Sequence, residues 1–123
     1  MFGQKGAGRV KLPNREKALV PKSKIAGYLL AATHPQGRHK AAFFGSFGFS
    51  LERPGLLVSA LKRHAADHEV VKVEDSRFGT RYIIEGVLEA PDGRTPAIRS
   101  VWFIEAGEEL PRFVTAYPLT MRN

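Results

Sequence analysis

The stretch that decides the fold is residues 80–105, TRYIIEGVLEAPDGRTPAIRSVWFIE. It consists of two runs rich in Ile, Val and aromatic residues, separated by a segment that contains the dipeptide Asp92-Gly93. Such runs are typical of β-strands, and Asp-Gly is typical of hairpin turns. The sequence therefore predicts a β-hairpin formed by residues 80–90 and 95–105.

Two further strands extend this hairpin on either side. Residues 69–75 (EVVKVED) and 112–118 (RFVTAYP) show the same period of two in polar and apolar side chains. Because the links RFG and AGEELP are short, each strand is expected to pair with its neighbour in sequence. The predicted sheet is a four-stranded antiparallel meander.

The chain before the sheet shows helical spacing. A first helix is predicted over residues 23–32, with Ser23 as its N-cap and Ile25, Tyr28 and Leu29 on its apolar face. A second is predicted over residues 34–47, ended by Gly48, and a third over residues 54–68. Helices followed by an antiparallel sheet define an α+β fold, with about three helices packed on one face of the meander.

Positive charge is concentrated at the N-terminal end. The 123 residues have a formal net charge of +7, and residues 1–24 contain seven lysines and arginines against a single glutamate. This pattern predicts a basic, flexible tail over residues 1–17 and a single domain over residues 18–123. The segment ALVP, residues 18–21, is expected to lie extended against that domain.

Composition narrows the class of protein. No apolar run approaches the roughly 18 residues that a membrane-spanning helix requires, and the chain has no cysteine and no signal-peptide pattern. We therefore expect a cytoplasmic protein without a membrane partner. No glycine-rich phosphate loop follows a strand and no acidic cluster suggests magnesium, so neither a nucleotide nor a metal cofactor is expected.

The sheet face turned away from the helices is the first candidate binding surface. Alternation turns six side chains outward: Arg81, Ile83, Glu85, Arg99, Val101 and Phe103. The last strand adds Phe113, Thr115 and Tyr117 if it presents the same side. Aromatic rings stack on bases and guanidinium groups bind phosphates, so this face suits single-stranded RNA. The alternative is that residues 18–21 or a second subunit cover its apolar members.

The start of the second helix is another candidate site. His34, His39 and Lys40 lie where free backbone N–H groups and the helix dipole attract a phosphate. Lys40 adds a full positive charge, and an imidazole such as that of His34 titrates near neutral pH. The alternative is an ordinary helix start, in which the lysine lies along the edge of the core and the histidine is solvated.

The third helix carries two histidines near its end. His64 and His68 have the i, i+4 spacing that can place two imidazoles on one metal ion. The neighbouring acids Asp67 and Glu69 do not complete a metal-binding pattern. We therefore favour the alternative, in which both histidines bind backbone carbonyls and complete the core.

Two segments resemble a known family. HPQGRHKAAFF (residues 34–44) and VWFIEAGEELPRFVTAYP (residues 101–118) resemble a family of small bacterial domains of unknown function, in which the pattern HPxGxxKAxFF precedes VWFIExGExxPRFVTAYP. The resemblance covers residues 12 to 118. It implies a domain that occurs alone and at the ends of larger proteins, without an activity attached to it.

The order of elements is also similar to the barnase/EndoU/colicin/RelE-type ribonuclease superfamily of bacterial toxins. This second resemblance implies metal-independent RNA cleavage by a few side chains around the sheet. The implied roles are proton transfer by His34, phosphate binding by Lys40 and Arg81, and orientation of the scissile group by Thr115 or Tyr117. The chain departs from the superfamily because no strand carries a histidine, where many of these enzymes place one.

Two functions follow as hypotheses. The first is an RNA-directed, toxin-type domain with metal-independent endoribonuclease activity. The second is a non-catalytic protein-binding module, either one half of a two-protein, toxin–antitoxin-like pair or a self-associating domain. In both hypotheses the sheet face around Arg99, Phe103 and Phe113 contacts the RNA or the partner.

Overall fold

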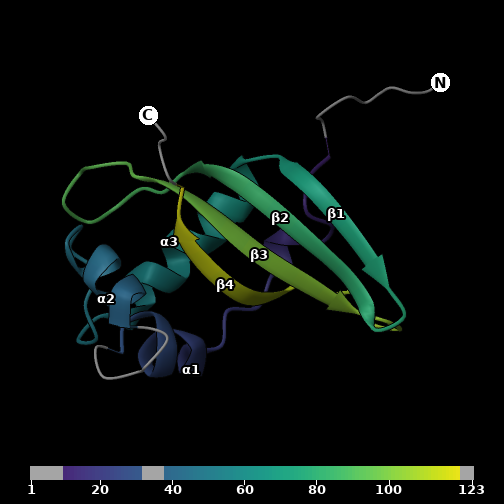
Figure 1. Cartoon of the computed structure of the whole chain (residues 1–123), viewed down its shortest axis with the longest axis horizontal. Coiled ribbons are helices and arrows are strands. Elements are labelled where there is room, and N and C mark those ends of the chain that lie inside the picture. Colours follow the sequence, from purple (N-terminus) through teal and green to yellow (C-terminus); the bar gives the residue numbers. More distant parts are fainter. Residues whose placement is uncertain (1–9, 32–37, 120–123) are drawn as a thin grey trace.

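The sheet has the predicted topology. The computed structural model describes residues 10–31 and 38–119, and its four antiparallel strands lie in the order β1-β2-β3-β4. Their bounds are Val70–Ser76 (β1), Gly79–Val87 (β2), Ala97–Glu105 (β3) and Arg112–Pro118 (β4). Figure 1 shows them as one twisted layer. The meander predicted from the short links is confirmed.

The helices precede the sheet, as an α+β fold requires. A short 3-10 turn, η2 (Arg15–Lys17), is followed by α1 (Lys22–Lys24), which continues into the π-helical turn η3 (Ile25–Leu29). The longer helices are α2 (Arg38–Gly45) and α3 (Pro54–Asp67). In Figure 1, α3 lies behind the sheet, and α1 and α2 lie at its lower left, on the β4 side. The predicted fold class is confirmed.

The first helix differs from its prediction in two respects. Its N-cap is Pro21 and it begins at Lys22, so the prediction that Ser23 caps it is wrong. It also widens after one turn, because the backbone N–H of Leu30 donates to the carbonyl of Ile25 at 2.8 Å, five residues back. Such π-turns are rare and often occur at functional sites. Tyr28 lies within this turn.

One face of the sheet and the helices enclose the core. Ile84, Ile98 and Trp102 are fully buried on that face, as the alternation of the strands predicts. The helices contribute further fully buried side chains: Ile25, Leu29, Phe44, Leu57, Leu61 and Ala65. The other face, which carries Arg81, Glu85 and Arg99, is the open face.

A β-bulge in the last strand changes which of its side chains face the core. The register shifts between Val101 and Trp102, so that Thr115 pairs with Val101 whereas Phe113 pairs with Trp102. Val114 is the extra residue of this β-bulge. Phe113 is therefore 1% exposed and packs edge-to-face on Trp102. The prediction that Phe113 lies on the open face is wrong.

Residues that precede the expected domain boundary at residue 18 also pack against the domain. Leu12 is fully buried, and the carbonyl of Val10 accepts a hydrogen bond from the N–H of Val70 at 2.8 Å. Leu19 forms a parallel bridge with Arg112, so residues 18–21 include an extended contact on the edge of β4. Among the expected tail residues, 10–17 are thus part of the packed structure.

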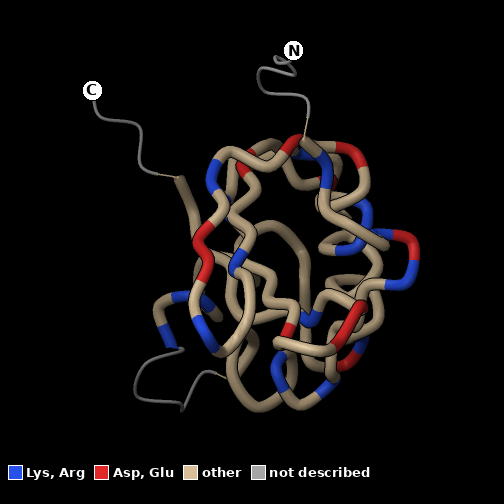
Figure 2. Tube along the Cα trace, turned by 90° about the vertical axis from the view of Figure 1, so that its right-hand side faces the viewer, with Lys and Arg blue, Asp and Glu red and all other residues tan. Residues whose placement is uncertain are grey.

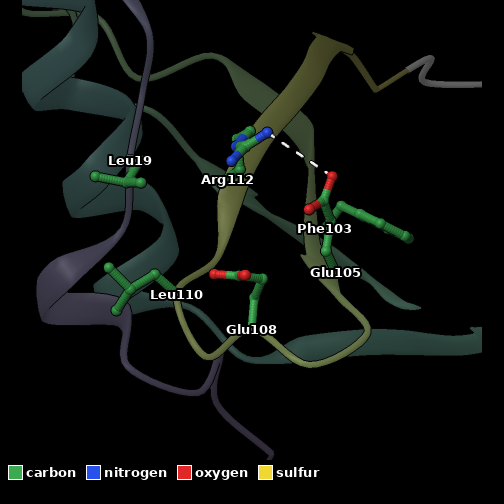
Figure 3. A pocket seen from close by; sticks show the side chains of 6 residues that line it. All are labelled: Leu19, Phe103, Glu105, Glu108, Leu110 and Arg112. Atoms are coloured by element: carbon green, nitrogen blue, oxygen red, sulfur yellow. Dashed lines mark ion pairs between the residues drawn. The ribbon is translucent and has the colours of Figure 1, made fainter. Parts of the chain in front are cut away.

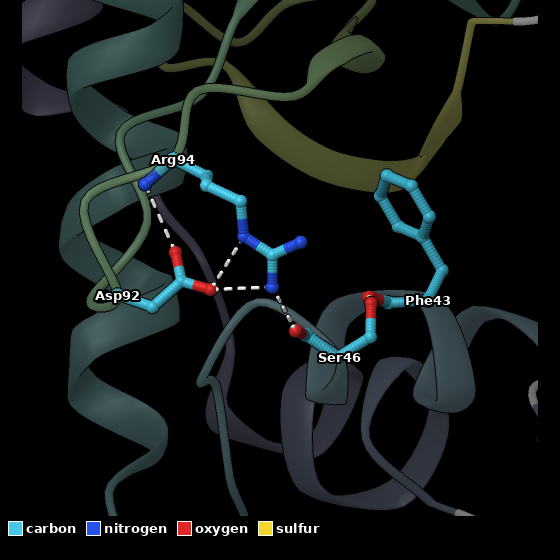
Figure 4. Close-up of polar contacts among 4 residues, drawn as sticks. All are labelled: Phe43, Ser46, Asp92 and Arg94. Atoms are coloured by element: carbon cyan, nitrogen blue, oxygen red, sulfur yellow. Dashed lines mark hydrogen bonds and ion pairs between the residues drawn. The ribbon is translucent and has the colours of Figure 1, made fainter.

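The loop between β2 and β3 is tied to the end of α2. Gly48, with φ +102°, ends the turn that follows α2. Arg94 binds the Asp92 carboxylate through Nε at 2.8 Å and donates from Nη2 to the Ser46 carbonyl at 2.6 Å (Figure 4). The hydrogen bonds from the Arg94 side chain and backbone to the Asp92 carboxylate hold the pKa of Asp92 below its usual value. The Asp92-Gly93 turn is therefore fixed by side chains as well as by the glycine.

His64 of α3 and His68, its C-cap, both bind backbone carbonyls, as the favoured alternative predicted. His64 is 2% exposed; its Nε2 lies 3.1 Å from the Gly86 carbonyl and its Nδ1 lies 3.0 Å from Ser100 Oγ. Because a carbonyl can only accept, Nε2 carries the proton and Nδ1 accepts from the Ser100 hydroxyl. Trp102 Nε1 donates to the same hydroxyl at 2.8 Å. The buried polar groups of this network are therefore all paired.

His68 explains why residue 86 is a glycine. Its Nε2 lies 2.9 Å from the Val87 carbonyl, and a Cβ placed on Gly86 would lie 2.5 Å from the His68 ring. We expect Gly86→Ala to lower the free energy of unfolding by about 1–3 kcal/mol, because the ring must move. The measurement is urea denaturation of this variant in the wild-type and in the His68→Ala backgrounds. An equal cost in both backgrounds would show that the ring is not the obstacle.

Candidate functional site

Lys40 connects the helical layer to the open face of the sheet. It comes one turn before the phenylalanines of α2, so its stem follows the edge of the core while its ammonium group reaches β4. Lys40 Nζ donates to the hydroxyl of Tyr28 at 2.6 Å and to Oγ1 of Thr115 at 2.9 Å. The helix start and the last strand therefore meet at this side chain.

The ammonium group of Lys40 contacts neutral groups. Its Nζ lies 4.8 Å from the centre of the Tyr28 ring and 5.5 Å from that of Tyr117, which are cation–π distances. No carboxylate of residues 10–31 or 38–119 lies within ion-pair distance of it. An ammonium group has three donors, and two are used here. Lys40 is thus a half-buried cation suited to an anionic ligand.

The contact with Lys40 changes the acidity of the Tyr28 phenol. The hydrogen bond from Lys40 is the largest cause that lowers the pKa of the Tyr28 phenol, and the bond with Thr115 lowers it further, against the effect of burial. A phenol of lowered pKa is a better proton donor than an ordinary tyrosine. The sequence predicted Tyr28 only as part of an apolar helix face, whereas the structure places it within the π-turn and beside Lys40.

A second charged group adjoins Lys40 along the sheet. Glu85, Arg99 and Tyr117 are directly opposite one another on β2, β3 and β4. Arg99 donates from Nε to Glu85 Oε2 at 2.8 Å and from Nη1 to the Tyr117 hydroxyl at 3.3 Å. The bonds to Tyr117 and Glu85 raise the pKa of the Arg99 guanidinium. Both side chains of the ion pair are about one-third exposed, 36% for Arg99 and 30% for Glu85.

The two groups form one site, because Tyr117 belongs to both. The Lys40 ammonium lies 5.5 Å, and the Arg99 guanidinium 5.7 Å, from the centre of the Tyr117 ring. We name this site the Tyr117 cluster. Its members are Tyr28, Lys40, Glu85, Arg99, Thr115 and Tyr117. It offers two cations, one carboxylate and three hydroxyl groups in a partly exposed position.

The structure brings together some of the predicted site residues and separates others. Lys40, Thr115 and Tyr117 meet in the cluster, and so does Arg99 from the predicted RNA or partner surface. Arg81 does not: it lies four residues from Glu85 along β2, about 13 Å at the rise of a strand, and is 3.9 Å from Glu74. His34 lies outside the described residues, and His39 is exposed on α2.

Phe103 marks the other end of the open face. It pairs with Arg81 on β2 and with Arg112 on β4. Figure 3 shows the pocket beside it, where Leu19 and Leu110 lie on one side of the charged side chains and Phe103 on the other. Arg112 lies 3.9 Å from Glu105 there. This pocket combines apolar and acidic groups and is separate from the Tyr117 cluster.

Charge over the whole domain is mixed. Figure 2 shows lysines and arginines alternating with aspartates and glutamates around the trace, without one side of a single sign. A binding site for an anion is therefore defined by local geometry, such as that of Lys40 and Arg99, and not by a broad basic face. Among the described residues, no group of three or more His, Asp or Glu side chains could hold a metal ion.

The fold and the cluster define a small α+β domain with a cationic, hydroxyl-rich site on its sheet. Residues 11–120 match the model of a family described as a domain of unknown function, DUF6883, and the chain belongs to that family. This confirms the resemblance to a small domain family. No curated protein matches the chain.

A solved structure from Klebsiella pneumoniae 342 has a similar fold. It is one chain of a contact-dependent growth inhibition toxin–immunity protein complex, superimposes with a TM-score of 0.65 and has 16% sequence identity. The match covers 83% of this chain and 100% of that chain. At this identity the comparison establishes a common fold. In the part of the chain that the structure describes, no helix is long and apolar enough to cross a bilayer.

Proposed function

We propose that this domain is an RNA-directed, toxin-type ribonuclease whose active site is the Tyr117 cluster. The observation that carries the proposal is the convergence of Lys40 and Arg99 on one tyrosine, with a carboxylate and hydroxyl groups beside them. Two cations that lie 5.5 and 5.7 Å from the centre of one tyrosine ring suit the charge that develops on a phosphoryl group during transfer. The similarity of the fold to a chain from a toxin–immunity complex also supports a toxin-type role.

The chemistry is a transesterification within the RNA. The ribose 2′-oxygen attacks the adjacent phosphorus, the bond from phosphorus to the 5′-oxygen breaks, and a 2′,3′-cyclic phosphate forms. The Glu85 carboxylate accepts the proton of the 2′-hydroxyl, and the Tyr28 phenol donates a proton to the leaving 5′-oxygen. Lys40 and Arg99 stabilise the charge on the phosphoryl oxygens. Thr115 and Tyr117 position the two cations, and these steps require no metal ion.

The test is cleavage of total RNA by the purified protein with EDTA present. We expect Glu85→Gln and Arg99→Ala to reduce the rate by about 10²–10³-fold, since each removes a group that acts in the transition state. Arg81→Ala is the matched control, because it removes an exposed arginine of the same face at a distance from the cluster. A loss in Arg81→Ala as large as that in Arg99→Ala would contradict this site. His34→Ala tests the proton transfer that the resemblance to the ribonuclease superfamily implies for His34.

The second candidate function is a non-catalytic module that binds a cognate protein. It is favoured by the pocket at Phe103, where Leu19 (44% exposed) and Leu110 (39% exposed) present apolar surface next to charged groups. The solved structure of similar fold belongs to a two-protein complex, which supports the same reading. Under this proposal wild-type protein leaves RNA intact, and Phe103→Glu abolishes co-purification with the cognate protein.

A further inference from the structure

The outer edge of β1 is an unpaired strand edge. β1 pairs with β2 on one side, and alternate residues of an antiparallel strand direct their backbone N–H and C=O groups to the other side. Val70 is covered there by the bond to Val10. Beyond it, no described segment pairs with Val71–Ser76 on the outer side, and Figure 1 shows β1 as the outermost strand.

This edge carries exposed valines beside its charged residues. Val71 is 55% exposed and Val73 is 46% exposed, whereas the corresponding edge of β4 is partly covered by Leu19. Proteins usually protect such edges with charges, prolines or covering segments, because a free apolar edge pairs with another strand. The β-bulge at Val71 interrupts only the first part of the strand, and residues 72–76 pair regularly with β2.

We propose that β1 is a self-association surface on which a second copy of this chain pairs antiparallel, joining the two sheets into one. The proposal concerns the edge opposite β4 and is independent of the proposed function, because the Tyr117 cluster stays accessible in such a dimer. The occupant is a second copy because the strand carries opposite charges two residues apart, and these face each other in one particular register of self-pairing.

That register follows from symmetry. A two-fold axis perpendicular to the joined sheet must lie midway between one residue of β1 and the same residue of the second copy. Only then do directly opposite residues share a face of the sheet. An axis at Lys72 places two lysines opposite each other, and an axis at Glu74 does the same with two glutamates. An axis at Val73 instead places Lys72 of each copy opposite Glu74 of the other. It also brings the two exposed Val73 side chains into contact.

The side chains are placed to make these contacts. Lys72 and Glu74 pair with Ile83 and Arg81 of β2, so both lie on the open face. Their side chains are 63% and 41% exposed and already form an ion pair of 3.1 Å within one chain. In the dimer, four charges of alternating sign form a row across the two-fold axis, with Val73 and its symmetry mate on the opposite face.

Sedimentation velocity of the full chain over a wide concentration range tests this surface. We expect the wild type to form a dimer with twice the mass of the monomer, and Val73→Lys, Lys72→Glu and Glu74→Lys to be monomers. Lys72→Glu/Glu74→Lys exchanges the two charges and is expected to restore the dimer. Val87→Lys is the matched control, because Val87 is 45% exposed and lies on β2 beyond the β1 ladder.

Three results would overturn the proposal. The first is a wild-type protein that stays monomeric at every concentration, in which case the edge is free or is used by a different partner. The second is a dimer that Val87→Lys disrupts as strongly as Val73→Lys. The third is a double charge exchange that remains monomeric although both single variants fold, which would exclude this register.

Discussion

Replacing Lys40 with methionine is expected to reduce RNA cleavage by about 10²–10³-fold, the usual cost of removing a group that stabilises transition-state charge. Methionine has a similar length and apolar stem, so the packing of the stem beside the core is retained. What is lost is the ammonium group that binds Tyr28 and Thr115. Both hydroxyl groups are partly exposed and can bind water instead, so the fold is expected to persist.

The control for this experiment is Lys62→Met. Lys62 is an exposed lysine of α3, and its replacement changes the net charge by the same amount. The two variants should also differ in a second readout. Spectrophotometric titration should show the pKa of Tyr28 rising towards its ordinary value in Lys40→Met alone, because the bond from Lys40 is what lowers it. Unchanged cleavage in Lys40→Met would show that the cluster is not the active site.

The second large effect is a loss of stability in acid that originates at His64. Burial lowers the pKa of this imidazole to about 4, against 6.5 for the unperturbed group. Between these values the unfolded chain binds a proton that the folded chain does not, so stability falls as the pH falls from 6.5 to 4. At 1.36 kcal/mol per unit, the loss is about 3 kcal/mol once the pH is below the folded-state value.

Denaturant unfolding at several pH values measures this loss, with His64→Gln as the comparison. Glutamine does not titrate, and its amide can still donate towards the Gly86 carbonyl. We expect the variant to be less stable than the wild type at neutral pH and to have a flatter pH dependence between 6.5 and 4. An identical slope in both proteins would show that another group causes the acid sensitivity.

The architecture could be predicted because its signals are local. Alternation in residues 80–105 fixed which side chains face the core, and short links left few topologies other than a meander. The third helix was predicted to within one residue at its C-terminal end, since Pro54 marks its start and its apolar face is regular. The same alternation predicted both Glu85 and Arg99 on the open face, where they prove to be directly opposite each other.

The errors arise where backbone geometry departs from the ideal period. The β-bulge in β4 adds one residue between Phe113 and Thr115, so simple alternation assigned Phe113 to the wrong face. The π-turn of η3 likewise depends on a hydrogen bond over five residues, which spacing does not reveal. Tyr28 was therefore not recognised as a partner of Lys40.

The candidate site was predictable in part. A lysine at the edge of the apolar stripe of α2 could be expected to reach the sheet, and Lys40 does contact Thr115. The sequence could not show which end of the open face it would reach. Because α2 lies at the end of the sheet where β4 ends, on the left of Figure 1, Lys40 meets the row of Glu85, Arg99 and Tyr117 and not that of Arg81.

The most direct test of the proposed function is the structure of the RNA ends that the wild-type protein produces in EDTA. The proposed reaction predicts a 2′,3′-cyclic phosphate on one fragment and a free 5′-hydroxyl on the other, with no cleavage after a 2′-deoxynucleotide. RNA that remains intact, or fragments that carry a 5′-phosphate, would contradict it.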